Sequence, residues 1–209
     1  MIKKSSRLWL NEHFSDPYVK QAQLNGFRSR AVYKLLEIEN KDHLFKPGMM
    51  VLDLGAAPGS WSQLIVQLVK PKGKVIAVDI LPMEPIEGVE FIQEDFSNEA
   101  VLKLVYAHCL KEQGIDWVVS DMAPNMSGHE SIDIPRSMYL AELTLDLSLS
   151  VLNTAGGCLM KVFQGEGFDS LLSECRKHYC SVVIRKPKAS RDRSREVYIL
   201  ARRLKIRKI

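Results

Sequence analysis

From residue 49 onward, short runs of apolar residues alternate with longer segments that carry apolar residues at helical spacing. The runs are apolar throughout rather than at every second position, which is typical of strands that helices cover on both faces. This alternation predicts an α/β fold built on a doubly wound, mostly parallel sheet. The expected strands are 49–54, 74–78, 89–92, 115–120, 158–163, 181–185 and 196–201, and the expected helices among them span about 61–68, 98–110, 134–152 and 168–179.

The last two expected strands, 181–185 and 196–201, are joined by ten residues that lack a helical pattern. Two parallel strands need a longer crossover, so we expect the final strand to run antiparallel to its neighbours. Residues 1–46 precede the sheet and form a basic N-terminal helical extension, with helical patches at 6–14 and 29–39. Residues 47–209 then form one domain, which ends in a basic C-terminal tail.

Composition narrows the class of protein. Apolar residues make up 46% of the chain and charged residues 26%, which excludes a disordered chain and a coiled coil. No run approaches the roughly 18 apolar residues of a membrane span, and the first 14 residues lack the apolar stretch of a signal peptide. The cysteines form no CxxC pair and have no histidine at zinc spacing. We therefore expect reduced thiols, no metal site, no membrane partner and a cytoplasmic location.

Charge is segregated along the chain. Residues 1–46 carry a net charge of +4, residues 47–184 carry −9, and residues 185–209 carry +9. An acidic body with basic ends is typical of a nucleic-acid-binding protein. Charge alone supports a solvated basic tail equally well.

The loop after the first strand is rich in small residues and has an unusual glycine spacing. Asp53 lies next to the last residue of the buried run 49–54. Gly55 and Gly59 follow, four residues apart, unlike the G-x-G-x-x-G of dinucleotide sites. In parallel sheets, ligands bind at the carboxyl ends of the strands. Asp79 ends the second strand, where a carboxylate accepts ribose hydroxyls, and Asp95 follows the third, where it can meet an adenine amino group. The glycine spacing of the loop, together with the two acids at the strand ends, favours an S-adenosylmethionine site of a class I methyltransferase. The alternative is a nicotinamide-binding domain.

Charged residues also stand where the sheet should be apolar. Lys161 interrupts a buried strand, Asp121 follows the fourth strand, and Glu196 opens the last one. An unpaired buried ammonium group is costly, so Lys161 should have a partner. If their strands are neighbours, these three side chains converge at one edge. Lys34 lies just off the apolar stripe of the 29–39 helix, and spacing alone favours a solvated lysine there.

Four long motifs carry a family resemblance: LGAAPG at 54–59, SDMAPN at 120–125, KVFQGEG at 161–167 and SRDRSREVY at 190–198. They resemble the FtsJ/RrmJ family of RNA 2′-O-methyltransferases. The resemblance implies the Rossmann-like class I methyltransferase fold with a seven-stranded sheet and helices on both faces. It also implies a catalytic tetrad and a set of cofactor contacts. The tetrad falls on Lys34, Asp121, Lys161 and Glu196, and the contacts with S-adenosylmethionine fall on Gly59, Trp61, Asp79, Asp95 and Asp121, to which the loop itself adds Asp53 and Gly55.

The resemblance also implies a substrate and partners. The implied substrate is a uridine in the A loop of 23S ribosomal RNA, and the implied partner is the assembled large ribosomal subunit. The resemblance also implies a role in late ribosome assembly. We expect the protein to be monomeric. The residues alone leave two alternatives open: 2′-O-methylation of tRNA or another RNA, and a non-catalytic assembly factor. Lys161 is expected either to accept the hydroxyl proton as a neutral base or to orient the hydroxyl as an ammonium group.

The basic ends would hold RNA phosphates beside the cleft, supplying affinity rather than base recognition. The candidates are Arg28, Arg30, Lys186, Arg191, Arg193 and Arg195, with Lys3, Lys4, Arg7 and Lys188 further along the same ends. Two departures from the family pattern, at Ser60 and at 128–131, lie outside the tetrad.

Overall fold

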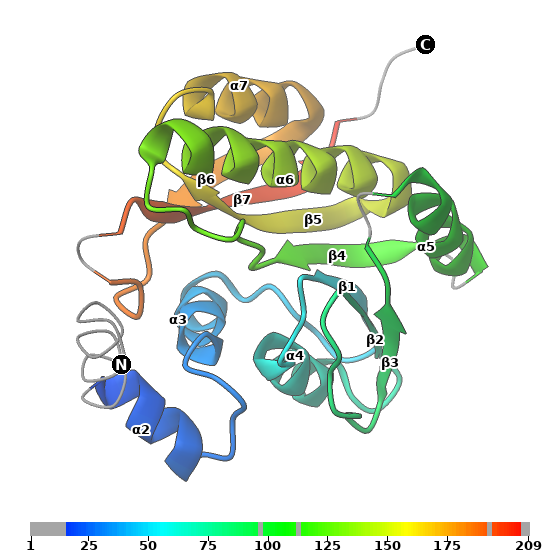
Figure 1. Ribbon diagram of the computed structural model, residues 1–209. Coiled ribbons are helices and arrows are strands. Elements are labelled where there is room, and N and C mark those ends of the chain that lie inside the picture. Colours follow the sequence, from blue (N-terminus) through cyan, green and yellow to red (C-terminus); the bar gives the residue numbers. More distant parts are fainter. Residues whose placement is uncertain (1–15, 96–97, 112–113, 192–193, 206–209) are drawn as a thin grey trace.

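The computed structural model describes residues 16–95, 98–111, 114–191 and 194–205. Within them, one seven-stranded sheet has the order β3-β2-β1-β4-β5-β7-β6 (Figure 1). The strands are β1 (Met50–Leu54), β2 (Lys74–Asp79), β3 (Val89–Gln93), β4 (Ile115–Ser120), β5 (Leu152–Phe163), β6 (Tyr179–Arg185) and β7 (Glu196–Leu204). The predicted α/β fold is confirmed.

Strand β7 is the strand that reverses direction. Strands β1 to β5 pair in parallel, whereas β7 lies between β5 and β6 and is antiparallel to both. The expected antiparallel strand is therefore confirmed. Because β7 runs backwards, its first residue, Glu196, lies opposite Phe163 at the carboxyl end of β5. The start of β7 thus lies at the edge where the parallel strands end.

Helices cover both faces of the sheet (Figure 1). One face packs against α3 (Val32–Asp42) and α4 (Ser60–Val69), and the other against α5 (Glu99–Lys111), α6 (Glu130–Val151) and α7 (Phe168–His178). Alternate strand residues serve the two layers. Val51 packs on the α3 and α4 side, and Leu52 and Leu54 pack on the other side. Burial on both faces explains why the strands are apolar throughout.

Part of the N-terminal extension belongs to this core. Val32, Leu35 and Ile38 of α3 lie in the same apolar cluster as Leu159 and Leu200 of the sheet. This packing fixes α3 against the strands, and therefore fixes any side chain that α3 presents to the sheet edge. The predicted helical patch at 6–14 lies outside the described residues.

A helix that the periodicity did not predict, α2 (Pro17–Leu24), precedes α3. The carboxylate of Asp16 accepts a hydrogen bond from the Tyr18 amide at 2.9 Å, and Pro17 occupies the first turn. An aspartate followed by proline is a helix-start signal, and it could have revealed this helix.

Several element boundaries differ from expectation by one to three residues, and the starts of α6 and β5 differ by more. Helix α6 begins at Glu130 rather than near 134, because the Asp133 carboxylate accepts the amides of Ser127 and Gly128 and holds the preceding loop in place. Strand β5 begins at Leu152 rather than at 158. Its first residue, Leu152, pairs with Ile115 of β4, and the register then shifts so that the next pair is Trp117 with Gly157. No apolar run marks residues 153–157. Within the described residues, no helix is long and apolar enough to cross a membrane.

Candidate active site

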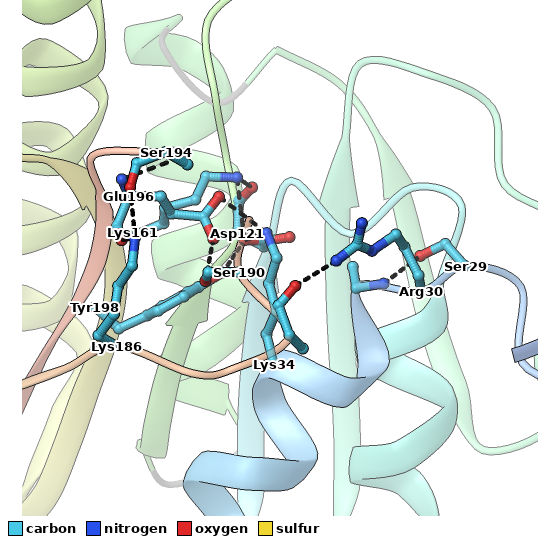
Figure 2. Close-up of polar contacts among 12 residues, drawn as sticks. Ser29, Arg30, Lys34, Asp121, Lys161, Lys186, Ser190, Ser194, Glu196 and Tyr198 are labelled. Carbon is cyan, nitrogen blue, oxygen red and sulfur yellow. Dashed lines mark hydrogen bonds and ion pairs between the residues drawn. The ribbon is translucent and has the colours of Figure 1, made fainter. Parts of the chain in front are cut away.

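Four charged side chains meet at the carboxyl edge of the sheet (Figure 2). Lys34 comes from α3, Asp121 follows β4, Lys161 lies in β5 and Glu196 opens β7. The Lys34 Nζ atom lies 2.8 Å from Glu196 Oε1 and 3.9 Å from Asp121 Oδ1. The Lys161 Nζ atom lies 3.0 Å from Asp121 Oδ1 and also donates to the Asp121 carbonyl oxygen. The convergence expected for Asp121, Lys161 and Glu196 is present in the structure. Lys34, which only the family resemblance placed with them, joins them.

Strand register explains the convergence. Lys161 follows Leu159 on the face that α3 covers, because side chains alternate along a strand. Lys161 is paired with Tyr198 of β7, and Glu196 precedes Tyr198 by two positions, so all three side chains share this face. Lys161 and Glu196 are each only 8% exposed. The lysine in a buried strand therefore has its charge partner, as its position requires.

Two hydroxyl groups that the sequence did not single out support the acids. The Tyr198 hydroxyl donates to Asp121 Oδ1 at 2.6 Å, and the Ser190 hydroxyl donates to Glu196 Oε1 at 2.8 Å (Figure 2). Both lie in the 190–198 motif. The two-residue spacing from Glu196 to Tyr198 is the signal that could have found the tyrosine, since it places both side chains on one face.

The surroundings keep Asp121 ionised and Tyr198 protonated. Burial acts to raise the pKa of Asp121, but the ammonium groups of Lys161 and Lys34 and the Tyr198 hydroxyl outweigh it, and the pKa lies below its ordinary value. Burial, followed by the negative charges of Asp121 and Glu196, raises the pKa of Tyr198 well above its ordinary value. Tyr198 is therefore a hydrogen-bond donor throughout the neutral range.

A cavity of about 430 Å³ opens on one side of the tetrad, at the ends of β1, β2 and β4. This volume is within the range of about 300–1,000 Å³ that is typical of small-molecule sites. Its lining includes Gly55, Asp79, Asp95 and Asp121, four of the seven residues predicted to contact S-adenosylmethionine. Ile80 and Leu81 also line it and are 60% and 59% exposed, which leaves apolar surface for a ligand to cover.

The donors and acceptors in this cavity fit S-adenosylmethionine. The Asp79 carboxylate accepts the Ala57 amide on one oxygen and the Leu81 amide on the other, each at 2.8 Å. Each oxygen retains acceptor capacity, so the oriented carboxylate can receive the two hydroxyls of a ribose. At Gly55 a Cβ atom would lie 2.3 Å from Met122 Cγ, so only glycine allows the β1 and β4 loops to approach this closely.

The remaining three residues predicted for the cofactor lie outside the lining of this cavity. Asp53 is buried and accepts the Ser62 hydroxyl at 2.6 Å. Burial raises the pKa of Asp53 to about 7, and Asp121 and Asp79 add to this rise, while the bond from Ser62 opposes it. The Trp61 indole donates to the Ala31 carbonyl oxygen at 2.9 Å, and Gly59 is the N-cap residue of α4, with a φ of 104°. These positions support the loop and α4.

A larger cavity, of about 810 Å³, opens on the other side of the tetrad. Lys34 and Glu196 line it, whereas Asp121 lines the smaller cavity. The tetrad therefore stands where the two cavities meet. The wall of the larger cavity combines cations with apolar groups, and it includes Arg30, Arg191, Arg195, Met126, Ile134 and Phe163.

Comparison with known proteins decides the family. Residues 27–204 match the model of the FtsJ-like methyltransferase family. The chain belongs to this family. It is 54% identical over 199 residues to the ribosomal RNA large subunit methyltransferase E of Hahella chejuensis, covering 95% of this chain and 96% of that protein. The family membership that the resemblance predicted is therefore confirmed.

Solved structures agree with the fold of this FtsJ-like methyltransferase. A chain described as a ribosomal RNA methyltransferase of Plasmodium falciparum superposes with a TM-score of 0.74 at 31% identity, over 85% of this chain and 98% of that one. A chain of the fibrillarin/Nop5p complex superposes with a TM-score of 0.58 at 18% identity, over 84% of each chain. The second match shows the fold alone.

The cations predicted for RNA have different surroundings in this FtsJ-like methyltransferase. Arg191 and Arg195 line the larger cavity, and Arg195 pairs with Glu130 at 3.0 Å. Arg30 also lines it, while its guanidinium binds Asp16 and the Ala189 carbonyl oxygen. Two other candidates bind the chain's own backbone: Lys186 donates to the carbonyl oxygens of Ser194 and Glu196, and Arg28 donates to three carbonyl oxygens. The candidates outside the described residues are Lys3, Lys4, Arg7 and Arg193.

Proposed function

We propose that this methyltransferase transfers the methyl group of S-adenosylmethionine to a ribose 2′-hydroxyl of large-subunit ribosomal RNA. The observation that carries the proposal is the tetrad at the junction of the two cavities, one sized for a cofactor and the other lined by cations. The name of the Hahella relative, 54% identical, supports the choice of RNA. The family resemblance further supports a uridine in the A loop of 23S RNA.

The tetrad would align the hydroxyl rather than create a new nucleophile. When bound, S-adenosylmethionine supplies an electrophilic methyl group, so the protein mainly has to hold the 2′-oxygen in line with it. Two of the positions around the Lys161 Nζ atom are taken by the carboxylate and the carbonyl oxygen of Asp121. The remaining position would be available to the substrate oxygen. Lys34, held by Glu196 at 2.8 Å, places a second ammonium group on the larger cavity.

The hydroxyl proton has two routes from this arrangement. A neutral Lys161 amine accepts the proton on its lone pair, whereas an ammonium group donates to the oxygen and the proton leaves to water as the methyl group transfers. Asp121 is a weak base toward the hydroxyl proton, because its pKa lies below the ordinary value. The pH dependence of single-turnover methyl transfer separates the routes: a rise through a group that titrates well below a free lysine supports the base, and a flat profile supports orientation.

The RNA would enter the larger cavity with its phosphates beside Arg191 and Arg195. Phosphate contacts of this kind supply affinity and position, and they weaken steeply as salt is added. The proposal extends to a cytoplasmic, monomeric protein whose substrate is the assembled large subunit and whose reaction belongs to late ribosome assembly.

The decisive experiment is transfer of a labelled methyl group to intact large subunits, free ribosomal RNA and tRNA, followed by mapping of the modified nucleotide. We expect label at a 2′-oxygen of one uridine of the large subunit. Lys161→Ala should bind cofactor and lose about 10²–10⁴-fold in rate. Label on tRNA would overturn the substrate assignment. A Lys161→Ala protein that still completes ribosome assembly in cells would favour the non-catalytic alternative.

A further inference from the structure

Arg28 joins two segments of backbone beside the cofactor cavity. Its guanidinium donates to the Pro58 carbonyl oxygen at 2.9 Å, to that of Glu84 at 2.6 Å and to that of Pro85 at 3.0 Å. Pro58 belongs to the glycine-rich loop before α4, and Glu84 and Pro85 belong to the segment between β2 and β3. One side chain from the N-terminal extension therefore ties the two loops that flank the cavity.

Arg28 is itself fixed in place. Its backbone amide donates to Gln63 Oε1 of α4 at 3.0 Å, and the Gln63 amide nitrogen donates to the Gly26 carbonyl oxygen at 3.2 Å. The neighbouring packing is close: a Cβ atom at Gly59 would lie 2.7 Å from Met83 Sδ, 2.8 Å from Ile86 Cδ1 and 2.9 Å from Arg28 Nη1. The side chains of the 80–87 segment are thus packed against the glycine-rich loop at the point where Arg28 binds.

The tied segment carries part of the cavity wall. It starts directly after Asp79, and its first two residues, Ile80 and Leu81, line the cavity with more than half of their surface exposed. The segment between Asp79 and β3 contains no regular secondary structure, so side-chain contacts have to fix its course. Arg28 supplies three such hydrogen bonds, each strengthened by the positive charge.

We infer that Arg28 is a positioning residue for the cofactor cavity: its guanidinium holds the 80–87 segment against the glycine-rich loop and so fixes Ile80 and Leu81. The inference rests on the proposed function, because it takes S-adenosylmethionine as the ligand of this cavity. It gives Arg28 a task other than the phosphate contact expected from its charge. Three of the five guanidinium N–H donors are directed at carbonyl oxygens of the chain itself.

Substitution by lysine separates the two roles. Lysine keeps the charge that a phosphate contact needs, but it lacks the planar fork that reaches several carbonyls together. We therefore expect Arg28→Lys and Arg28→Gln to raise the dissociation constant for S-adenosylhomocysteine about tenfold, measured by calorimetry without RNA. Hydrogen exchange should quicken at amides 80–87 in both variants. RNA affinity of Arg28→Lys, and its salt dependence, should stay at the wild-type level.

Arg191→Gln is the matched control, since Arg191 lines only the larger of the two cavities. It should weaken RNA binding and lower the salt dependence, with the S-adenosylhomocysteine affinity unchanged. The inference is overturned if Arg28→Lys binds S-adenosylhomocysteine as the wild type does, whether or not Arg28→Gln loses RNA affinity. Failure of the proposed function would show differently, as a wild-type protein that binds no S-adenosylhomocysteine.

Discussion

Lys161 and Tyr198 face each other across β5 and β7, and both donate to the same oxygen, Asp121 Oδ1, at 3.0 Å and 2.6 Å. A charged donor and a neutral donor therefore share one carboxylate. In the proposed function Lys161 meets the reacting oxygen, whereas Tyr198 acts only through Asp121. The tyrosine can thus be altered to change the electrostatics of the site while the charged groups stay in place.

Replacing Tyr198 by phenylalanine should move the acidic side of the pH–rate profile upward. The Tyr198 hydroxyl helps to hold the pKa of Asp121 below its ordinary value, so its loss lets the carboxylate protonate at higher pH. We also expect kcat/KM to fall about tenfold, the cost of one hydrogen bond to a charged group. Single-turnover rates from acid to neutral pH measure both effects. An unchanged acidic limb would show that Asp121 ionisation does not depend on Tyr198.

Gly55→Ala should lower the stability of the protein and its affinity for S-adenosylhomocysteine by more than the strain of a positive φ alone would. Gly26 provides a matched control, because both glycines have a φ of +72° but only Gly55 meets a neighbour, Met122, at 2.3 Å. The shared backbone strain should cost each variant about 1 kcal/mol, and overpacking should cost Gly55→Ala about 1–3 kcal/mol more. Denaturant unfolding and S-adenosylhomocysteine calorimetry measure the difference. Equal losses in the two variants would contradict the close approach of the loops.

Asp42→Asn should destabilise the fold in a pH-dependent way. Arg185 donates to both carboxylate oxygens of Asp42 at 2.7 Å, and these bonds, opposed by burial, hold the pKa of Asp42 below its ordinary value. The contribution is complete above the ordinary carboxyl pKa and is lost as pH falls through the lowered folded value. We expect a loss of about 1–3 kcal/mol at neutral pH, which shrinks in acid.

Glu99→Gln is the comparison for Asp42→Asn, since Glu99 forms an exposed ion pair with Lys103 on α5. An exposed pair of this kind contributes about 0–1 kcal/mol. Urea unfolding at neutral and acidic pH should therefore distinguish the two variants. A loss for Asp42→Asn that stays constant with pH would assign its effect to packing rather than to charge.

Glu130→Gln should strengthen RNA binding. Glu130 pairs with Arg195 at the wall of the larger cavity, where the proposed function places a phosphate, and so it competes with the RNA for that cation. Both side chains are more than half exposed, so the change should be modest, about two- to fivefold. Binding isotherms at two salt concentrations measure it. Glu142→Gln, an exposed acid elsewhere on α6, removes the same charge and should have less effect.

The sheet could be predicted because apolar runs alternate with helical segments along the sequence. Three of the four tetrad residues could be predicted because their charges interrupt or flank those apolar runs. Lys161 interrupts a strand that is otherwise buried, and Asp121 and Glu196 stand at strand ends, where parallel topology directs functional groups. Lys34 could not be predicted from periodicity. Its role depends on how α3 packs against the sheet, through Leu35 and Ile38, and a helix pattern does not specify that orientation.

The contacts of the arginines also could not be predicted from the local sequence pattern. Arg28 and Arg30 look alike in the sequence, yet one binds carbonyl oxygens beside the cofactor cavity and the other binds Asp16 and lines the larger cavity. Basic composition measures how much positive charge a segment has. Which cations are used inside the protein depends on contacts between residues that are distant in the chain.

The ion pair between Lys34 and Glu196 joins positions 162 residues apart, and Glu196 opens the strand that fills the gap between β5 and β6. During synthesis, a growing polypeptide therefore carries its glycine-rich loop, Asp121 and Lys161 before it can complete the proposed catalytic tetrad. Enzyme competence should arise in one step, when β7 leaves the translating ribosome and inserts into the sheet.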